Sequence, residues 1–428
     1  MDANQGFTSS DERKKYTGRR LVVLGKSSNF QSINSQAEEV SLRLASSKDY
    51  PNNTGGYQEA FREADGLVFE RFGIAVINQD HEEQINRLTT SATSRETFLY
   101  SEPERFVYAL GPERLGLWQR ICALFLPKKP SPPPVSDKIS FEDDNEAYWG
   151  IHAVKAMSAN YSGKGVKIAI LDTGFNLSHQ DFQDRTIVSE SFIPEETVDD
   201  LNGHGTHCTG IAAAGMNREN NGRYGVAKDS SIYIGKVLSN AGSGSDSSIL
   251  AGLEWALTNS CKVVSMSLGA SISQGESYSK IYNDLAKKLM DEGLLIIAAA
   301  GNDSNRSSGI ISPVSHPANC PNIMAVGALD NDMTIADFSC AGVNAEGGEV
   351  NLAAPGVDIF SAYKSPENYR RLSGTSMATP FVAGLAALLW EEFPDASPAE
   401  IWAKLEQNAY KLPFPLRDVG KGLAQTKN

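Results

Sequence analysis

Residues 166–174, VKIAILDTG, join an unbroken apolar run to an aspartate and a glycine, and runs of this kind decide the expected fold. The pattern recurs at IYIGKVL (232–238), KVVSMSL (262–268), LLIIAAA (294–300) and NIMAVGA (322–328). Continuous apolar runs are typical of strands that are buried on both faces of a parallel sheet. Helical patterns lie between them, at 245–259 and 278–292 among others. This alternation predicts a doubly wound α/β domain, in which a mostly parallel sheet has helices on both faces.

A proline-rich stretch, LPKKPSPPPVSDKIS (126–140), separates this region from a smaller one before it. The smaller region shows the order βαββαβ, with element patterns at 20–25, 33–45, 66–78, 80–90 and 104–110. That order predicts a small α+β domain whose helices lie on one face of its sheet. We therefore expect four segments: a disordered N-terminus (1–19), the small domain (20–112), a helix-like spacer with the linker (113–144) and the α/β domain (145–428).

Composition and charge narrow the class of protein. The 428 residues have a formal net charge of −13 and no cluster of Lys and Arg with interleaved aromatics, so nucleic acid is not an expected partner. The first twenty residues are polar and no later apolar run reaches about 18 residues, so we expect neither a secretory signal nor a membrane span. The compartment stays open between the cytoplasm and export.

The cysteine count is odd and no CxxC spacing occurs, which argues against a disulfide framework and against a zinc site. The five cysteines are Cys122, Cys208, Cys261, Cys320 and Cys340. One disulfide, such as Cys320 with Cys340, is left open.

Four polar residues stand where an open parallel sheet places its ligands. Asp172 ends one apolar run and Asn302 follows another, whereas His204 and Ser376 stand at the starts of helical segments. A serine at a helix start lies beside unpaired backbone N–H groups, which stabilise a developing negative charge. It becomes a nucleophile only with a base, such as His204, and a carboxylate that orients the base, such as Asp172. The amide of Asn302 would then be a second donor to the oxyanion.

Four motifs in the larger region resemble those of the subtilisin-like serine proteases. They are AILDTG (169–174), NGHGTHCTG (202–210), AAAGND (298–303) and GTSMATPFVAG (374–384). Their order, Asp then His then Ser, is the order of that family. The cysteine in GTHC and the segment YGVAK resemble the proteinase K branch more than the bacillary enzymes. The resemblance spans about residues 145–412 and implies a serine endopeptidase that acts through an acyl-enzyme.

The resemblance also implies where substrate lies. Substrates of this family add an antiparallel strand to two backbone segments, and a pocket receives the side chain before the cut. The implied substrate-binding residues are Ser243, Gly244, Ser267, Leu268, Gly269, Ala300 and Gly301. Because the pocket floor carries no fixed charge, we expect protein or peptide substrates with a broad preference for apolar or aromatic side chains before the cut.

The smaller domain resembles the inhibitory propeptide of this family in its length and element order. The resemblance implies that FVYAL (106–110) lies in the cleft. The precursor would cut itself after Leu110 or in the stretch up to about Asn145. The protein would then be a self-inhibited zymogen, a monomer whose own N-terminal domain is its intramolecular inhibitor.

No cofactor is expected to be required for this chemistry, and calcium would have only a structural role. Asp181 matches a ligand position of the family, and the oxygen-rich loop 216–225 stands at the place of a ligand loop. Asn351 stands where the proteinase K branch has an acidic ligand, which argues against a second site. Solvated loops without metal are the alternative at Asp181.

Two rival interpretations use the same residues. A catalytically silent binding module would keep the N-terminal domain in the cleft permanently, although the intact set of Asp172, His204 and Ser376 argues against it. An esterase is disfavoured because GTSMA differs from the GxSxG elbow. His207 and Cys208 are expected to be structural, the first facing away from His204 and the second lying beneath the imidazole.

Overall fold

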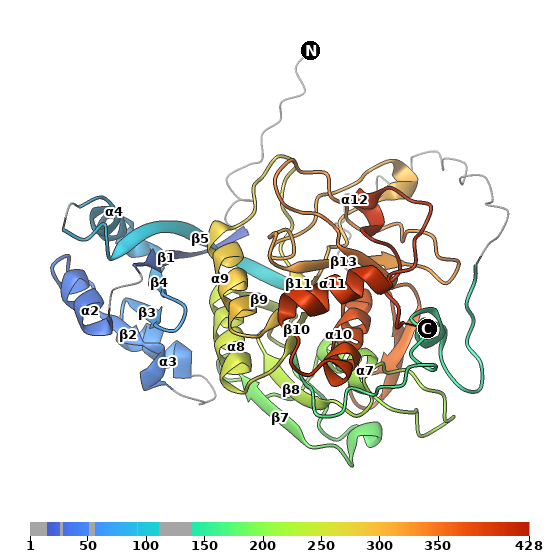
Figure 1. Ribbon diagram of the computed structural model, residues 1–428. Coiled ribbons are helices and arrows are strands. Elements are labelled where there is room, and N and C mark those ends of the chain that lie inside the picture. The colour runs from blue at the N-terminus through green and yellow to red at the C-terminus, as the bar shows by residue number, and fades with distance from the viewer. Residues whose placement is uncertain (1–14, 26–28, 51–55, 92, 111–138, 428) are drawn as a thin grey trace.

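The computed structural model describes residues 15–25, 29–50, 56–91, 93–110 and 139–427 (Figure 1). The predicted spacer up to residue 138, with Cys122, and most of the predicted disordered N-terminus lie outside these residues. The described residues form a smaller N-terminal part, 15–110, and a larger part, 139–427.

The larger part is built on a seven-stranded sheet in the order β14-β13-β12-β10-β6-β8-β7. Its strands are β6 (Lys167–Asp172), β7 (Ile187–Ser191), β8 (Ser231–Lys236), β10 (Val263–Met266), β12 (Leu295–Ala299), β13 (Met324–Leu329) and β14 (Leu352–Pro355). All neighbouring strands in this sheet run parallel. The five apolar runs of the sequence thus correspond to β6, β8, β10, β12 and β13, as the fold prediction requires.

Helices cover both faces of this sheet. The main ones are α7 (His204–Ala213), α8 (Asp246–Thr258), α9 (Lys280–Asp291) and α10 (Thr375–Glu392). Ile168 and Ile170 of β6 belong to the core that contains α7 and α10, whereas Ala169 and Leu171 belong to the core that contains α8 and α9. Successive side chains of a strand point to opposite faces, so both faces of β6 are buried. The predicted doubly wound α/β fold is confirmed.

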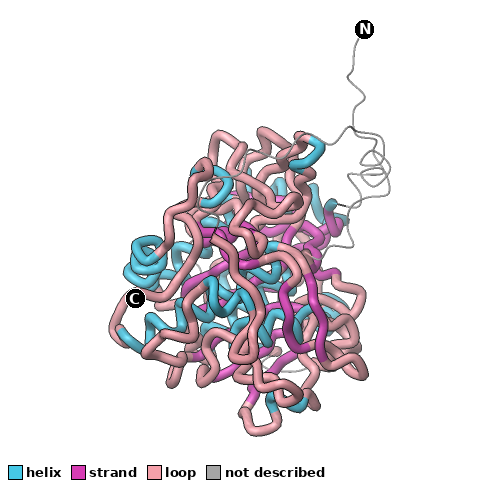
Figure 2. Tube along the Cα trace, turned by 90° about the vertical axis from the view of Figure 1, so that its right-hand side faces the viewer, coloured by secondary structure: helices cyan, strands magenta, loops and turns pink. Residues whose placement is uncertain are grey.

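Two helices lie near the end of the larger part, α11 (Pro398–Asn408) and α12 (Leu416–Val419). The Ser397 hydroxyl accepts from the Glu400 N–H, and the Glu400 carboxylate accepts from the Ser397 N–H, the expected capping box. Loops and turns cover much of the side seen in Figure 2. Among the described residues, no helix is both long enough and apolar enough to cross a membrane.

The smaller part is an α+β unit with more elements than predicted. Its strands lie in the order β5-β1-β4-β3-β2. They are β1 (Tyr16–Leu24), β2 (Leu44–Ser46), β3 (Gly66–Phe69), β4 (Ile74–Asn78) and β5 (Phe98–Ala109). The helices are α2 (Phe30–Glu38), α3 (Gly56–Glu63) and α4 (Glu82–Thr90). The βαββαβ core is present, and β2 and α3 are additional to it.

The predicted helix over 33–45 is wrong in its second half. The helix ends at Glu38, Ser41 adopts a positive φ of 64°, and Leu44 pairs with Gly66 of β3 in a parallel strand. A positive φ is unfavourable for a residue other than glycine, so tertiary contacts must stabilise this backbone conformation of Ser41. Leu42 and Leu44 supply such contacts because both are buried in the core of the smaller part.

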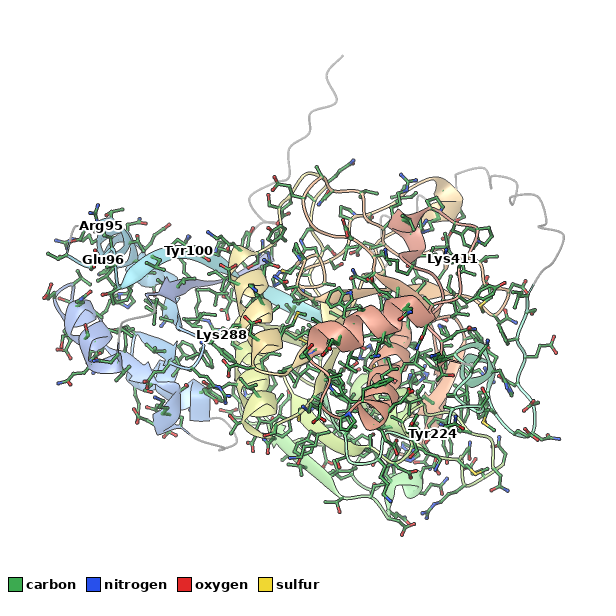
Figure 3. All side chains as sticks on the ribbon, in the orientation of Figure 1. Arg95, Glu96, Tyr100, Tyr224, Lys288 and Lys411 are labelled. Carbon is green, nitrogen blue, oxygen red and sulfur yellow. The ribbon has the colours of Figure 1, made fainter. Side chains whose placement is uncertain are left out.

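Strand β5 connects the two parts (Figure 1). Its first half pairs with β1, and its last residues, Phe106–Ala109, pair antiparallel with β9 (Ser243–Ser245) and β11 (Leu268–Gly269) of the larger part. Tyr100 of β5 and Lys288 of α9 lie at the border between the parts (Figure 3). The Tyr100 hydroxyl donates to Asp284, 3.3 Å away, and the Lys288 ammonium donates to the carbonyl of Arg71.

The four cysteines of the described residues are free thiols, and all are buried. The disulfide between Cys320 and Cys340 that the sequence left open is therefore not formed. Each thiol has a different partner: Cys320 Sγ donates to the carbonyl of Ser279, 3.5 Å away, and Cys340 Sγ accepts from the N–H of Asp303, 3.3 Å away. The thiols act as small apolar groups with weak hydrogen bonds.

Candidate active site

Asp172 and His204 meet where a strand ends and a helix begins. Asp172 is the last residue of β6 and His204 the first of α7, and Asp172 Oδ1 lies 2.7 Å from His204 Nδ1. Both side chains are buried. Gly203 before the helix has a φ of 98°, and a Cβ there would lie 2.4 Å from the ring of Tyr363. Only glycine fits this entry into α7.

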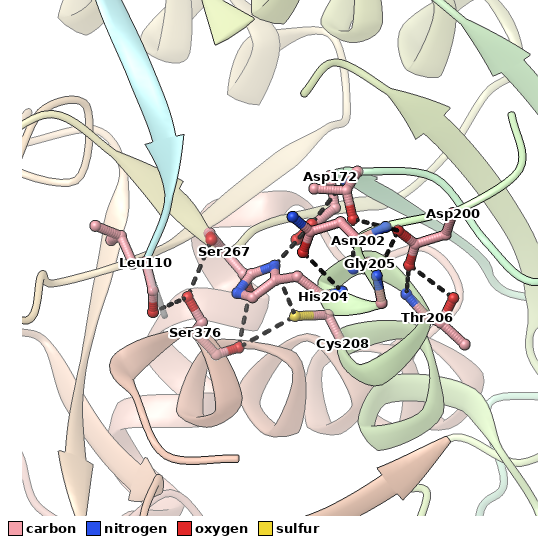
Figure 4. A network of polar contacts seen from close by, with 12 residues as sticks. Leu110, Asp172, Asp200, Asn202, His204, Gly205, Thr206, Cys208, Ser267 and Ser376 are labelled. Carbon is pink, nitrogen blue, oxygen red and sulfur yellow. Dashed lines mark hydrogen bonds and ion pairs between the residues drawn. The ribbon is translucent and has the colours of Figure 1, made fainter. Parts of the chain in front are cut away.

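Asp200 joins the strand end to the helix start (Figure 4). One of its carboxylate oxygens accepts from the N–H of Gly203 at 2.8 Å and from the hydroxyl of Thr173 at 2.8 Å. The other accepts from the N–H of Thr206 at 2.8 Å and from its hydroxyl at 2.7 Å. A carboxylate at this position satisfies free N–H groups and faces the positive end of the helix dipole. Sequence patterns do not mark this residue, because Asp200 is one of several acids in a loop and the N-cap position of α7 is occupied by Gly203.

Ser376 is the second residue of α10 and is buried. Cys208 contacts both residues, since its Sγ lies 3.9 Å from His204 Nδ1 and 3.5 Å from the Ser376 carbonyl oxygen (Figure 4). Ser376 Oγ lies 2.8 Å from the carbonyl oxygen of Leu110 and 3.0 Å from that of Ser267, and it donates to these acceptors. His204 Nε2 is buried and has no hydrogen-bond partner among the described residues. The structure therefore brings Asp172, His204 and Ser376 together, with the serine proton directed at carbonyls rather than at the imidazole.

The backbone of α10 is adapted around Ser376. Pro380, four residues later, has no N–H to give to the Ser376 carbonyl. The hydroxyl of Ser267 donates to that carbonyl at 2.8 Å, and Cys208 Sγ lies 3.5 Å from it. Ser267 thus contacts Ser376 twice, through its side chain and through its backbone. Cys208 also lies 3.9 Å from His204 Nδ1, where the sequence analysis placed it.

Asn302 and Gly374 complete the surroundings of the Leu110 carbonyl. Asn302 Nδ2 donates to this oxygen at 2.6 Å. The N–H and hydroxyl of Thr375 donate to Asn302 Oδ1 at 2.9 and 2.8 Å, which fixes the amide with its nitrogen toward Leu110. A Cβ on Gly374 would lie 2.9 Å from the same carbonyl oxygen, so glycine permits the approach.

The residues that the sequence predicts to bind substrate lie along both sides of the end of β5. Gly244 is paired with Val107 and Ser243 with Tyr108 on one side, and Leu268 with Ala109 and Gly269 with Tyr108 on the other. Ser267 accepts from the N–H of Leu110 at 3.4 Å. A Cβ on Gly269 would lie 3.3 Å from Leu110 Cδ1. Ala300 and Gly301 lie next to Ser315, whose N–H donates to the carbonyl of Ala300 at 2.8 Å.

Burial acts to lower the pKa of both histidines on α7, but their neighbours differ, and the net change in pKa is opposite for the two rings. The charge of Asp172 outweighs burial at His204 and raises the pKa of that imidazole well above its usual value. His207 has no acid beside it among these contacts, and burial lowers its pKa to about 3. Its Nε2 lies 3.0 Å from the carbonyls of Ile359 and Arg370, so a neutral ring donates there. At Cys208 burial disfavours the charged thiolate and therefore raises the pKa of the thiol.

Asp181 does not fit a calcium site. Its carboxylate oxygens accept from the Tyr224 hydroxyl at 2.6 Å, from the Tyr369 hydroxyl at 2.9 and 3.0 Å, and from the N–H of Arg218 at 3.0 Å. These protons occupy the lone pairs that a cation would need. The loop 216–225 thus holds Asp181 by hydrogen bonds.

Comparisons with known proteins agree on one family. The sequence model of the Subtilase family matches residues 163–423. The chain is 39% identical over 263 residues to Subtilisin DY of Bacillus licheniformis, which covers 61% of this chain and 90% of that protein. It is 39% identical over 293 residues to Subtilisin E of Bacillus subtilis (strain 168), covering 67% and 72%. It is 40% identical over 280 residues to Subtilisin of Bacillus pumilus, covering 64% and 95%.

Proposed function

This chain belongs to the subtilase family and is a serine endopeptidase, and from that premise we propose which residues perform the reaction. Ser376 is the nucleophile, His204 the general base and Asp172 the residue that orients the imidazole. The observation that carries this proposal is the carbonyl of Leu110, held 2.8 Å from Ser376 Oγ and 2.6 Å from Asn302 Nδ2. A peptide carbonyl in this position has the nucleophile and an oxyanion donor in contact with it.

Ser376 Oγ attacks the carbonyl carbon of the residue before the cut. His204 Nε2 accepts the serine proton, after the hydroxyl turns from the carbonyl to the imidazole. Asp172 keeps the proton on Nδ1 and stabilises the imidazolium, consistent with the raised pKa of His204. Asn302 and the backbone N–H of Ser376 stabilise the oxyanion. His204 then protonates the leaving amine, and water hydrolyses the acyl-enzyme by the same route. No cofactor takes part in these steps.

We further propose that the chain is a self-inhibited precursor, with residues 15–110 as the inhibitory region. Support comes from β5, whose last residues occupy the cleft as an antiparallel strand between β9 and β11. Leu110 stands at the position of the residue before the cut, so the bond between Leu110 and Gly111 is the proposed site of self-cleavage. The buried Leu110 side chain, beside Gly269, supports a preference for apolar residues at this position.

The proposal is tested by incubating the purified full-length chain and measuring intact mass and labelling by a fluorophosphonate. The wild-type chain should give a fragment that begins at Gly111 and should become labelled. Ser376→Ala should stay intact and unlabelled. Ser373→Ala is the matched control, because Ser373 lies three residues earlier and its hydroxyl accepts from the backbone N–H of Asp358 at 2.9 Å.

Three outcomes would contradict parts of the proposal. Cleavage after Leu110 by the Ser376→Ala chain would contradict the role of Ser376. An intact wild-type chain that hydrolyses peptides at full rate would contradict the self-inhibited precursor. An intact chain that never reacts with the probe would favour the rival interpretation, a silent module with its cleft permanently filled.

A further inference from the structure

Arg105 is the sixth residue before the proposed cut, counting Leu110 as the first. It faces the larger part, residues 139–427, which we now call the protease part. From Arg105 to Tyr108 burial alternates along β5: Arg105 and Val107 are buried, whereas Phe106 and Tyr108 are half-buried. This alternation is that of a strand with one face against the enzyme. The Arg105 guanidinium lies 3.3 Å from Glu276 Oε1, and the N–H of Arg105 donates to Asp246 Oδ2 at 2.8 Å.

Asp246 is a fixed acceptor for the backbone of a chain in the cleft. It is the first residue of α8 and fully buried. Its Oδ1 lies 2.9 Å from Nε2 of His316, a side chain that is itself 1% exposed. The other oxygen, Oδ2, faces the N–H of Arg105. A backbone contact of this kind is available to a peptide of any sequence, so the cleft extends to the sixth residue.

Glu276 supplies the contact that depends on the side chain. The N–H of Ser273 donates to Glu276 Oε2 at 3.0 Å and holds the carboxylate in place. The two cations that contact Glu276 within the described residues are Arg105 and Lys15, and both belong to the N-terminal part. Burial lowers the pKa of Arg105, but the charges of Asp246 and Glu276 contribute to a net increase. The two carboxylates thus act on one guanidinium.

We propose that Asp246 and Glu276 form a subsite that selects arginine or lysine as the sixth residue before the cut in substrates. The inference rests on the proposed function, because it assumes that substrates lie in the cleft as β5 does. Asp246 holds the backbone of the sixth residue, and Glu276 pairs with its cationic side chain. Once residues 15–110 leave, both carboxylates face the cleft without Lys15 and Arg105, and a basic substrate residue takes the place of Arg105.

The test uses two internally quenched peptides based on residues 104–114, ERFVYALGPER, which differ only at the position of Arg105. One keeps arginine there, and the other has citrulline, which has the same shape without the charge. Active-site titration gives the concentration of activated enzyme. A tetrapeptide substrate that ends in leucine is too short to reach the subsite, and its cleavage shows whether the enzyme is active. We expect kcat/KM to be about threefold to fivefold higher for the arginine peptide at low ionic strength. The ratio should approach one at about 1 M salt.

Two variants assign the preference to the subsite. Glu276→Gln should bring the ratio of the two peptides close to one. Glu292→Gln is the matched control. Glu276 precedes the first residue of α9, whereas Glu292 follows the last one, and the 12 residues of this helix span about 18 Å. Glu292→Gln should keep the wild-type ratio.

The outcomes separate the inference from the proposed function. Equal kcat/KM values for the two peptides, in an enzyme that cleaves the tetrapeptide, would overturn the subsite and leave the proposed function standing. A preference that survives in Glu276→Gln would also overturn it. Failure to cleave the tetrapeptide at all would overturn the proposed function and this inference with it.

Discussion

His204 and His207 show how single neighbours set the chemistry of identical side chains on one helix. Both rings are buried on α7, and burial disfavours a charged imidazole. Asp172 lies 2.7 Å from His204 and favours its cationic form, whereas two backbone carbonyls hold His207 as a neutral donor. One ring can therefore take up a proton during a reaction, and the other keeps its position by staying neutral.

His207 should make stability depend on pH below neutrality. Its pKa is about 3 in the folded chain and about 6.5 in an unfolded one. Between these values the unfolded chain binds one more proton, so the free energy of unfolding rises with pH by about 1.4 kcal/mol per unit for this group. His204, whose pKa is raised, acts above about pH 6.5 and does not contribute in this window. His207→Gln, which keeps an N–H donor, should remove this part of the slope.

Urea unfolding between about pH 4 and about pH 6 measures the slope. Both proteins should carry Ser376→Ala, so that self-digestion does not interfere. The parent slope should exceed that of the His207→Gln protein by about one proton. Equal slopes would show that His207 is not held neutral in the folded chain.

The positions of Asp172, His204, Asn302 and Ser376 could be predicted because each stands at a boundary that local sequence marks. An apolar run that ends in a polar residue, or a glycine before a helical stretch, is visible without tertiary structure. Asp200 and Asp246 could not be found in this way. Asp200 acts through Thr173, 27 residues earlier in the chain, and Asp246 through Arg105, 141 residues earlier. Acids are common in loops and helix starts, and only the fold shows which of them receive such donors.

At the scale of elements, β5 is a strand of one part that caps two helices of the other. Glu104 accepts from the N–H of Ser247 in the first turn of α8 at 2.9 Å. Glu102 accepts from the N–H of Lys280 at 2.9 Å and of Ile281 at 3.2 Å, at the start of α9. Carboxylates at these ends satisfy free N–H groups and face the positive ends of the helix dipoles. Residues 15–110 therefore contact the larger part through the starts of these two helices as well as through the cleft.

Glu102→Ala should weaken the hold of residues 15–110 on the cleft. Loss of a helix cap costs about 0.5 to 2 kcal/mol, which corresponds to about a twofold to thirtyfold weaker association. The full-length variant should therefore react with a fluorophosphonate faster than the wild-type chain by up to this factor. Glu96→Ala is the control, since Glu96 is exposed at the far end of the smaller part (Figure 3). Equal labelling rates for Glu102→Ala and wild type would show that the cap adds nothing to inhibition.

The strands of the large sheet were the most predictable elements, and the smaller part the least. Strands buried on both faces leave long apolar runs, and β6, β8 and β12 coincide with theirs. By contrast, β2 is three residues long and exists because Leu44 pairs with Gly66 of β3. No local pattern distinguishes it from the end of a helix. The same holds for the extent of β5, which is set by β1 on one side and by the cleft on the other.

At the scale of the whole molecule, charge is distributed unequally across the border between the two parts. Lys15, Arg62 and Arg71 of the N-terminal part face carboxylates of the protease part. Their partners are Glu276, Glu195 and Glu292 respectively. Arg62 and Glu195 are largely exposed, so this pair contributes little to the association. The cation comes from the N-terminal part in these three pairs and in the pair of Arg105 with Glu276, so the pairs act together as an attraction between the parts.

Salt should therefore speed the release of residues 15–110, the proposed inhibitory region. Raising the ionic strength from about 0.05 M to about 1 M shortens the screening length to about 3 Å and removes most of the attraction between partly exposed charges. Three pairs at a few tenths of a kcal/mol each predict about a twofold to tenfold faster rise of fluorophosphonate labelling in the full-length chain. Arg71→Gln should show a smaller dependence on salt than wild type, because Arg71 lies 2.9 Å from Glu292 and its charge acts across the border. A rate that falls or stays constant with salt would mean that strand pairing and the helix caps alone hold the two parts together.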